Sequence, residues 1–253
     1  MRVVSLVPSW TETLIEAGVH VVGRTRFCIH PREKVAAIPV VGGTKRIQWP
    51  KLEEVRPDLL VLDREENALQ MADRSPVPWV ATHVTSVKDV PENLRKLSER
   101  LERPELLALG ERWRTVCERI TAESPKPGWL DLPGVIEWLR PAGPQVDQFL
   151  YLIWMEPWMA VGCDTFIGSM FELLGFGSRM CRLDEKYPTI RLEDYDPTRT
   201  LLLFSSEPYP FGRRRQALEE LPFASALVNG ESYSWYGIRA LRFLEGQTRS
   251  PGR

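Results

Sequence analysis

Short apolar runs alternate with polar or helix-forming segments along the first half of the chain, and this alternation constrains the fold most. The first run is residues 3–7, where Val predominates. Further strand-like runs lie at residues 21–22, 40–41, 59–62 and 79–81. After the first run, Ser9 and Glu12 have the spacing of a helix capping box, and Gly18 suits a helix end. Strands that alternate with helices predict an α/β fold with a mostly parallel sheet.

The second half of the chain repeats a pattern of the first half. Leu52 and Pro57 precede the apolar run 59–62, and Leu192 and Pro197 precede a similar run at 201–204. The two copies are about 140 residues apart. The repeat predicts two related α/β lobes, each with its own sheet.

A long helix is predicted between the two lobes. Pro104 suits the first position of a helix, and apolar residues then recur at three- and four-residue spacing up to Ile120. The segment 124–128 is rich in Pro and Gly and ends the pattern. We therefore predict an N-terminal lobe over 1–103, a connecting helix over 104–124 and a C-terminal lobe over 125–253.

Charge and cysteine usage narrow the classes of function. Lys and Arg number 33 and Asp and Glu number 34, so the charge balance does not favour a nucleic-acid partner. The most apolar stretch, 146–163, is interrupted by two acids and a Pro, so no membrane span is predicted. The four Cys residues are far apart, which predicts free thiols. Together with the lack of a signal peptide, this predicts a cytoplasmic protein, or a periplasmic or cell-surface one if the start is misassigned.

Aromatic and polar residues follow several predicted strands, where open parallel sheets bind ligands. Trp and Tyr faces with a few polar groups predict a cleft between the lobes for a large, flat, partly apolar ligand. Trp10, Trp158 and either Trp235 or Tyr236 are the expected stacking walls, with burial in the core as the alternative for each. The predicted ligand-binding residues are Pro8, Ser9, Trp10, Phe27, Cys28, His30, Lys45, Trp158, Tyr209, Trp235 and Tyr236.

Cys28 and His30 are the candidate metal ligands. A thiolate and an imidazole both bind soft metals, and the nearby Arg24 and Arg26 are expected to lower the pKa of Cys28. The alternative is that both residues only face the cleft. The run Gly42-Gly43-Thr44-Lys45 resembles the tail of a phosphate-binding loop but lacks its first Gly. No catalytic motif such as GxSxG or HExxH is present in the sequence, so no enzyme is predicted.

Short motifs along nearly the whole chain carry a resemblance to a known family. The N-terminal motifs are 3–9 with Thr11-Glu12, 22–25, Cys28-x-His30-Pro31, 42–45, 57–59 and 65–67. The C-terminal motifs are 137–139, Pro157-Trp158, 165–167, 206–211 and 234–237. Together these motifs resemble the cobalamin-binding branch of the class III periplasmic binding proteins, in the helical-backbone metal receptor superfamily.

The resemblance implies two Rossmann-like lobes joined by one long rigid helix, with a cleft for a metal chelate and modest closure on binding. It also implies one surface Glu per lobe that pairs with Arg residues of an ABC permease, here Glu66 (or Glu65) and Glu207, provided that the protein is exported. The expected function is non-catalytic binding of a metal chelate, first of all a corrinoid such as cobalamin or cobinamide, with no tightly bound cofactor. The alternatives are a siderophore or haem binder, a cytoplasmic metal-handling protein or metalloenzyme using Cys28 and His30, and an interaction module.

Overall fold

The computed structural model describes residues 1–123 and 127–248, and it divides into two compact units. The N-terminal unit contains Met1–Val116 together with Trp235–Gly246. The C-terminal unit contains Cys117–Ser234 and the residues from Gln247 on. We describe each unit by itself.

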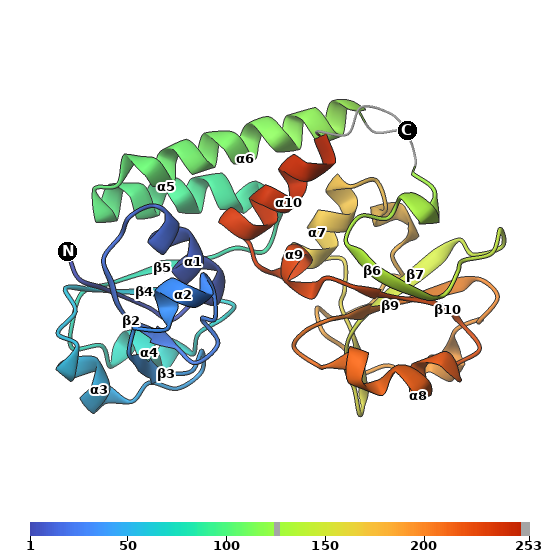
Figure 1. Cartoon of the computed structure of the whole chain (residues 1–253), viewed down its shortest axis with the longest axis horizontal. Helices are drawn as coiled ribbons and strands as arrows, with labels where there is room; N and C mark the ends of the chain where they lie inside the picture. The colour runs from blue at the N-terminus through green and yellow to red at the C-terminus, as the bar shows by residue number, and fades with distance from the viewer. Residues whose placement is uncertain (124–126, 249–253) are drawn as a thin grey trace. The chain divides into compact units, whose positions relative to one another are not determined.

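The N-terminal unit is built on a five-stranded sheet with the order β3-β2-β1-β4-β5, in which every strand pair is parallel (Figure 1). Its strands are β1 (Val3–Ser5), β2 (Val21–Thr25), β3 (Val40–Gly42), β4 (Leu59–Asp63) and β5 (Trp79–Thr82). All five residues of β4 are buried, as expected for a central parallel strand that is covered on both faces. The prediction of a parallel α/β sheet is therefore confirmed.

Helices cover this sheet on both faces. They are α1 (Pro8–Glu16), α2 (Arg32–Val35), α3 (Trp49–Glu54), α4 (Leu69–Asp73), η1 (Val87–Asp89), α5 (Val90–Leu101) and α10 (Ile238–Thr248), with the first part of α6 (Pro104–Glu123). Figure 1 shows α5 alongside α6, and Gly110 makes this possible because a Cβ there would lie 3.3 Å from the Pro91 carbonyl oxygen.

The first helix begins differently from the prediction. Pro8 occupies the first turn and Val7 is the N-cap residue, so no side chain caps the helix. The predicted capping box of Ser9 and Glu12 is therefore wrong. Glu12 instead accepts two hydrogen bonds of 2.8 Å from the Arg239 guanidinium on α10, while Gly18 ends the helix region with a φ of +74°, as predicted.

The C-terminal unit has a second five-stranded sheet, with the order β6-β10-β9-β7-β8. The three central strands, β7, β9 and β10, are parallel, and the edge strands β6 and β8 run antiparallel to their neighbours. The strands are β6 (Val135–Arg140), β7 (Gln148–Met155), β8 (Trp158–Ala160), β9 (Thr200–Ser205) and β10 (Ala224–Val228). Two separate, mostly parallel sheets are what the repeated pattern predicted.

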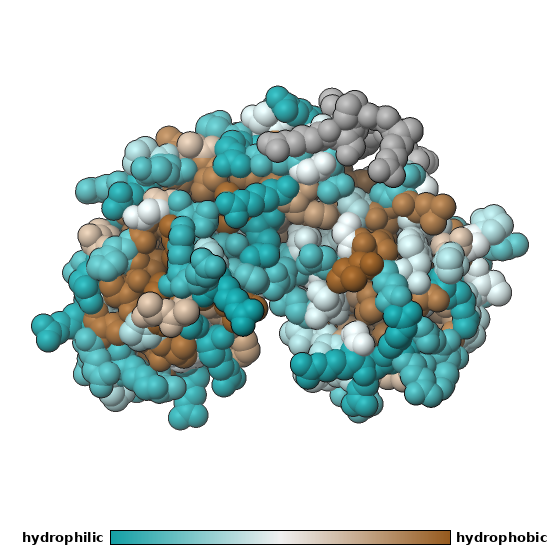
Figure 2. All heavy atoms as spheres, viewed as in Figure 1, coloured by the Kyte–Doolittle hydropathy of each residue, from teal (hydrophilic) through white to brown (hydrophobic). Residues whose placement is uncertain are grey.

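Shorter helices surround the second sheet. They are η2 (Trp129–Asp131), α7 (Phe166–Leu173), η3 (Gly177–Arg179), η4 (Leu192–Asp194), η5 (Phe211–Arg214), α8 (Arg215–Glu219) and α9 (Gly230–Ser234). In Figure 2 most of the visible face of both units is hydrophilic, and hydrophobic residues gather between the polar ones. In the part of the chain that the structure describes, no helix has the length and apolar character needed to cross a membrane. The four Cys residues are free, as predicted.

The helix predicted over 104–124 is present as α6, which spans Pro104–Glu123, but the compact units do not follow the predicted lobe boundaries. The division falls inside α6, after Val116, and α10 belongs to the N-terminal unit. Long-range hydrogen bonds explain this, since the Ile238 amide donates to Thr13 Oγ1 at 3.0 Å and the Trp113 indole donates to the Gly237 carbonyl oxygen at 3.2 Å. Part of the predicted Pro/Gly break, residues 124–126, lies outside the described residues.

Candidate ligand-binding site

Four strands of the N-terminal sheet end in a polar residue that is almost fully buried. These residues are Ser5, Thr25, Asp63 and Thr82, and none is more than 1% exposed. Because the strands are parallel, their carboxyl ends meet at one edge, which is the edge where open α/β sheets bind ligands. The buried hydroxyl and carboxyl groups fix the loops at this edge by hydrogen bonds.

Hydrogen bonds from Ser5, Thr11 and Thr25 form a network around Cys28. Its sulfur lies 3.1 Å from Thr11 Oγ1 and 3.1 Å from Thr25 Oγ1, and Thr11 Oγ1 also lies 2.8 Å from Ser5 Oγ. The thiol is fully buried, and burial raises its pKa although Arg24 opposes this effect. The predicted lowering of the Cys28 pKa is therefore wrong.

Arg24 lies close to Cys28, but its guanidinium binds backbone carbonyl oxygens and not the thiol. Its guanidinium donates to the backbone carbonyl oxygens of Val35 at 2.9 Å and of Cys28 at 3.2 Å, and so it ties the loop after β2 to α2. Arg26 is exposed, and its guanidinium lies 4.7 Å from the centre of the Phe27 ring. Both arginines thus have contacts that do not depend on a thiolate.

His30 and Cys28 differ in accessibility, although the sequence places them two residues apart. Both follow β2 in a loop instead of lying on a strand, and only His30 keeps partial exposure. The His30 ring packs edge-on against Trp235 at 5.2 Å between centroids. Within residues 1–123 and 127–248, no group of three or more His, Cys, Asp or Glu side chains could hold a metal ion.

Trp10 is part of the core and is not an exposed stacking wall as predicted. It has no exposed surface, and its indole N–H donates to Thr82 Oγ1 at 2.8 Å. Thr82 in turn donates to Asp63 Oδ2 at 2.6 Å. The Tyr236 ring packs edge-on against Trp10 at 5.0 Å between centroids.

The other predicted residues of this unit differ in exposure. Trp235 and Tyr236 are 8% and 4% exposed, and Ser9 is 5% exposed, so each presents little surface to a ligand. Pro8 is half-buried, whereas Phe27 is 45% exposed and Lys45 is exposed.

The loop after β4 carries Glu66, the predicted docking residue of this unit, and its alternative Glu65. Asn67 holds this loop, because its side-chain amide donates to the Thr44 carbonyl oxygen at 2.7 Å and its Oδ1 accepts the Asp63 amide at 2.8 Å. Glu65 pairs with His83 at 3.2 Å, and Glu66 is half-buried. The two acids therefore stand on a loop with a defined conformation.

Glu207, the predicted docking residue of the C-terminal unit, is also fixed in place. Ser234 Oγ donates to Glu207 Oε1 at 2.6 Å, and Ser205 Oγ donates to the Glu207 carbonyl oxygen at 2.5 Å. Gly230 leaves room for this arrangement, since a Cβ there would lie 2.3 Å from Ser205 Oγ and 2.9 Å from Glu207 Cγ.

An aromatic cluster in the same unit includes Tyr209 and Phe211, which follow Glu207 in the sequence. Trp158 is half-buried and stacks parallel to Phe211 at 6.3 Å between centroids. Tyr209 is 9% exposed and donates from its hydroxyl to Met155 Sδ at 3.7 Å. Trp154 packs edge-on against Tyr209 and is 40% exposed. Trp154 was not predicted from the sequence, and strand alternation does not reveal it, because Leu150 and Leu152 at the alternate positions of β7 are buried.

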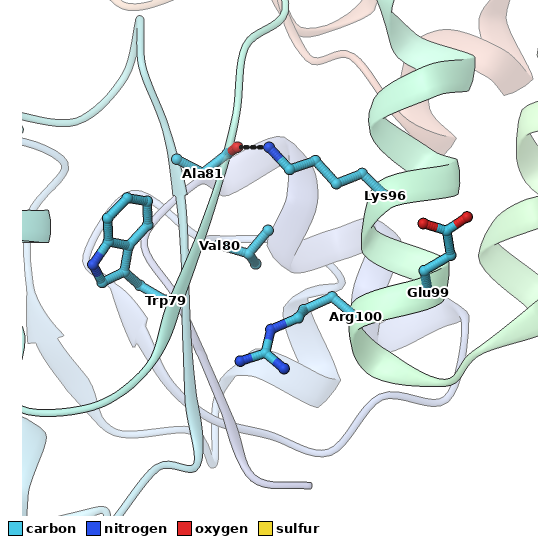
Figure 3. A pocket seen from close by; sticks show the side chains of 6 residues that line it. All are labelled: Trp79, Val80, Ala81, Lys96, Glu99 and Arg100. Carbon is cyan, nitrogen blue, oxygen red and sulfur yellow. Dashed lines mark hydrogen bonds between the residues drawn. The ribbon is translucent and has the colours of Figure 1, made fainter.

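One surface hollow lies between β5 and α5, away from the residues predicted for the site. Its volume is about 420 Å³, and Trp79, Lys96 and Arg100 are among the residues that line it (Figure 3). Lys96 Nζ reaches across it and donates to the Ala81 carbonyl oxygen at 2.6 Å. Lys96 belongs to α5, and its ammonium covers a carbonyl oxygen of the edge strand β5, so we interpret this contact as protection of the sheet edge.

This chain matches known proteins in its three-dimensional structure but not in its sequence. No family model matches this chain, and no curated protein sequence matches it either. Solved structures of periplasmic binding proteins do match. Staphylococcus aureus IsdE in complex with haem superposes with a TM-score of 0.72 at 14% identity, covering 98% of this chain and 97% of that one.

Two further solved structures superpose on this chain in the same way. A periplasmic haem-binding protein from Pseudomonas aeruginosa has a TM-score of 0.71 at 18% identity, covering 98% of this chain and 91% of that one. The periplasmic vitamin B12-binding protein BtuF of Vibrio cholerae has a TM-score of 0.67 at 16% identity, with 98% and 94% covered. The chain therefore has the fold of the class III periplasmic binding proteins, as its sequence resemblance predicted.

Proposed function

We propose that this protein binds a metal chelate without catalysing a reaction, and that a corrinoid is the first ligand to test. The likeness of fold over 98% of the chain to proteins described as binding vitamin B12 or haem carries this proposal. The sequence motifs of the cobalamin-binding branch favour the corrinoid. The haem-binding neighbours make haem the second candidate.

The side chains at the carboxyl edges support this class of ligand. The N-terminal unit offers the half-buried His30 and the exposed Phe27 and Lys45, and the C-terminal unit offers Trp158 and Tyr209. Each unit by itself thus presents aromatic side chains beside polar groups, which suits a flat ligand. Pro8 and Ser9 lie at the carboxyl edge of the N-terminal sheet, because they begin α1 directly after β1.

The competing function, direct metal handling by Cys28 and His30, has less support. A buried thiol with a raised pKa is a poor metal ligand, because metals bind the thiolate. We therefore propose that the protein holds a finished chelate mainly through shape and aromatic contact. Cys28→Ser is then expected to keep most of the affinity, whereas loss of all binding would favour direct ligation.

A permease partner and the cellular location are further proposals. If the protein serves an ABC transporter, Glu66 and Glu207 are the proposed docking residues, since both carboxylates stand on loops of defined conformation. Charge removal at either residue would then weaken transport and leave chelate affinity unchanged. A cytoplasmic location is proposed separately, and cell fractionation with an antibody tests it.

An absorbance titration with a panel of chelates tests the function. Cobinamide, cobalamin, haem and a ferric siderophore are added in turn, and the spectrum reports a change of axial ligand. His30→Ala is compared with His83→Ala, a matched control whose imidazole pairs with Glu65. We expect saturable binding of one chelate, weakened only by His30→Ala. Equal effects of the two variants would remove His30 from the site, and no binding by any chelate would contradict the function.

A further inference from the structure

A tight turn presents two cations beside α3 and α4 in the N-terminal unit. Gly42 and Ile47 form an isolated antiparallel bridge, and the Gly43 amide donates to the Arg46 carbonyl oxygen at 2.8 Å. Gly42 is required here because its φ is +153° and a Cβ would lie 2.3 Å from that oxygen. The turn therefore places Lys45 and Arg46 side by side in sequence at its exposed end.

These two cations line a hollow of about 330 Å³ together with Arg74. Its apolar part comes from Ile47 and Met71, which are 6% and 4% exposed and belong to the core of the unit. No carboxylate is among the residues that line it. The hollow therefore combines a rigid apolar base with three positive charges.

The guanidinium groups of the hollow have no anionic partner in the described parts of the chain. For Arg46 and Arg74, the structure gives no side-chain hydrogen bond or ion pair over residues 1–123 and 127–248. Arg74 is positioned by Trp49, whose ring centre lies 5.6 Å from the guanidinium carbon. Lys45 Nζ donates to the Glu65 carbonyl oxygen at 3.0 Å, which is a neutral partner.

Three like charges around one hollow repel each other, and an anion bound among them would remove this repulsion. Guanidinium groups match oxyanions well, because they donate two parallel hydrogen bonds to a carboxylate or a phosphate. We propose that this hollow binds a small oxyanion that carries at least two negative charges. Its volume lies at the lower end of the range for ligand pockets, about 300–1,000 Å³, which fits a small molecule.

This proposal does not rest on the proposed chelate function, although Lys45 is common to the two sets of residues. It is formed within the N-terminal unit alone, and its residues other than Lys45 were not predicted as chelate contacts. The oxyanion chemistry could come from phosphates or from carboxylates. Pyrophosphate and citrate therefore serve as the two probes, and their relative affinities identify the source.

Isothermal titration calorimetry of the full chain without chelate, at low ionic strength, tests the proposal. We expect one saturable site for pyrophosphate, citrate or both. Arg46→Gln and Arg74→Gln should each weaken binding about tenfold, since each removes a charge-assisted hydrogen bond. Affinity should also fall as salt is raised.

Arg64→Gln is the matched control, because Arg64 is exposed in the same unit and does not line the hollow. It should bind both probes like the wild type, and all variants should keep the wild-type melting temperature. Absence of saturable binding for both probes, each at about 10 mM, would overturn the proposal. An equal loss in Arg64→Gln would also overturn it, since the binding would then reflect diffuse surface charge.

Discussion

Replacement of Trp10 by Ala tests whether the carboxyl edge of the N-terminal sheet is built around a core indole. The side chain is fully buried and donates a 2.8 Å hydrogen bond to Thr82 Oγ1. A buried Trp removes about 150–250 Å² from water, worth roughly 4–6 kcal/mol at about 25 cal/mol per Å². Since measured Trp→Ala losses in cores are about 3–5 kcal/mol, we expect a loss in this range.

Urea denaturation followed by circular dichroism measures the free energy of unfolding. Two further variants are compared with Trp10→Ala. Trp10→Phe keeps most of the packing but removes the indole donor, and it should cost about 1–3 kcal/mol. Trp79→Ala is the control, because Trp79 is 47% exposed on an edge strand and should cost less than about 1 kcal/mol. If Trp10→Ala unfolded like the wild type but lost chelate affinity, Trp10 would be a ligand-facing wall and our assignment would be refuted.

Three further changes test other parts of the structure. Glu12→Gln should lower the free energy of unfolding by about 2–3 kcal/mol, because it removes the buried carboxylate charge that accepts two hydrogen bonds from the Arg239 guanidinium. Glu92→Gln removes only an exposed pair with Arg95, so it should cost much less in the same urea assay. Gly230→Ala should destabilise the folded protein by about 1–3 kcal/mol, since the new Cβ would lie 2.3 Å from Ser205 Oγ. Gly212→Ala is the control, because a Cβ there meets nothing within 4 Å. Equal melting temperatures for the two variants would contradict this prediction. Burial raises the pKa of Cys181 to about 12 from its ordinary value of 9.0, so the folded state holds the proton more tightly than the unfolded state. Its contribution to stability is complete below pH 9.0 and is lost as the pH rises towards 12, so Cys181→Ala should show a shallower alkaline loss of stability than the wild type.

The sheets were predictable from the sequence because their central strands are short, apolar and separated by strong turn signals. The run at 59–62 became β4, and the repeated Leu–Pro spacing correctly indicated a second sheet with β9 at its centre. The helix over 104–123 was predictable because its apolar stripe begins at a Pro and ends before a Pro/Gly segment.

The packing of the last helix could not be predicted in the same way. Residues 235–246 return to the N-terminal unit through contacts with residues more than 120 positions earlier, including Thr13 and Trp113. Periodicity within a segment carries no information about such partners. For the same reason, Glu12 fitted a local capping box in the sequence but pairs with Arg239 in the structure.

The residues at the carboxyl edge of the N-terminal sheet were predictable from the sequence, but their exposure was not. Polar residues after the strands correctly marked the carboxyl edge, yet the sequence does not say which side chains point into the core. Trp10 and Cys28 are buried by the loops that they help to hold, while His30, two residues after Cys28, keeps partial exposure. The burial of Cys28 also reversed the expected direction of its pKa change.

Equilibrium dialysis of the purified chain against cobinamide and against haem tests the central claim most directly, because it counts the chelates that are bound per chain. The account predicts retention of one chelate per chain, with a dissociation constant of about 10 μM or lower for at least one of the two ligands. Retention of neither ligand at about 100 μM, by a chain that is folded by circular dichroism, would contradict it.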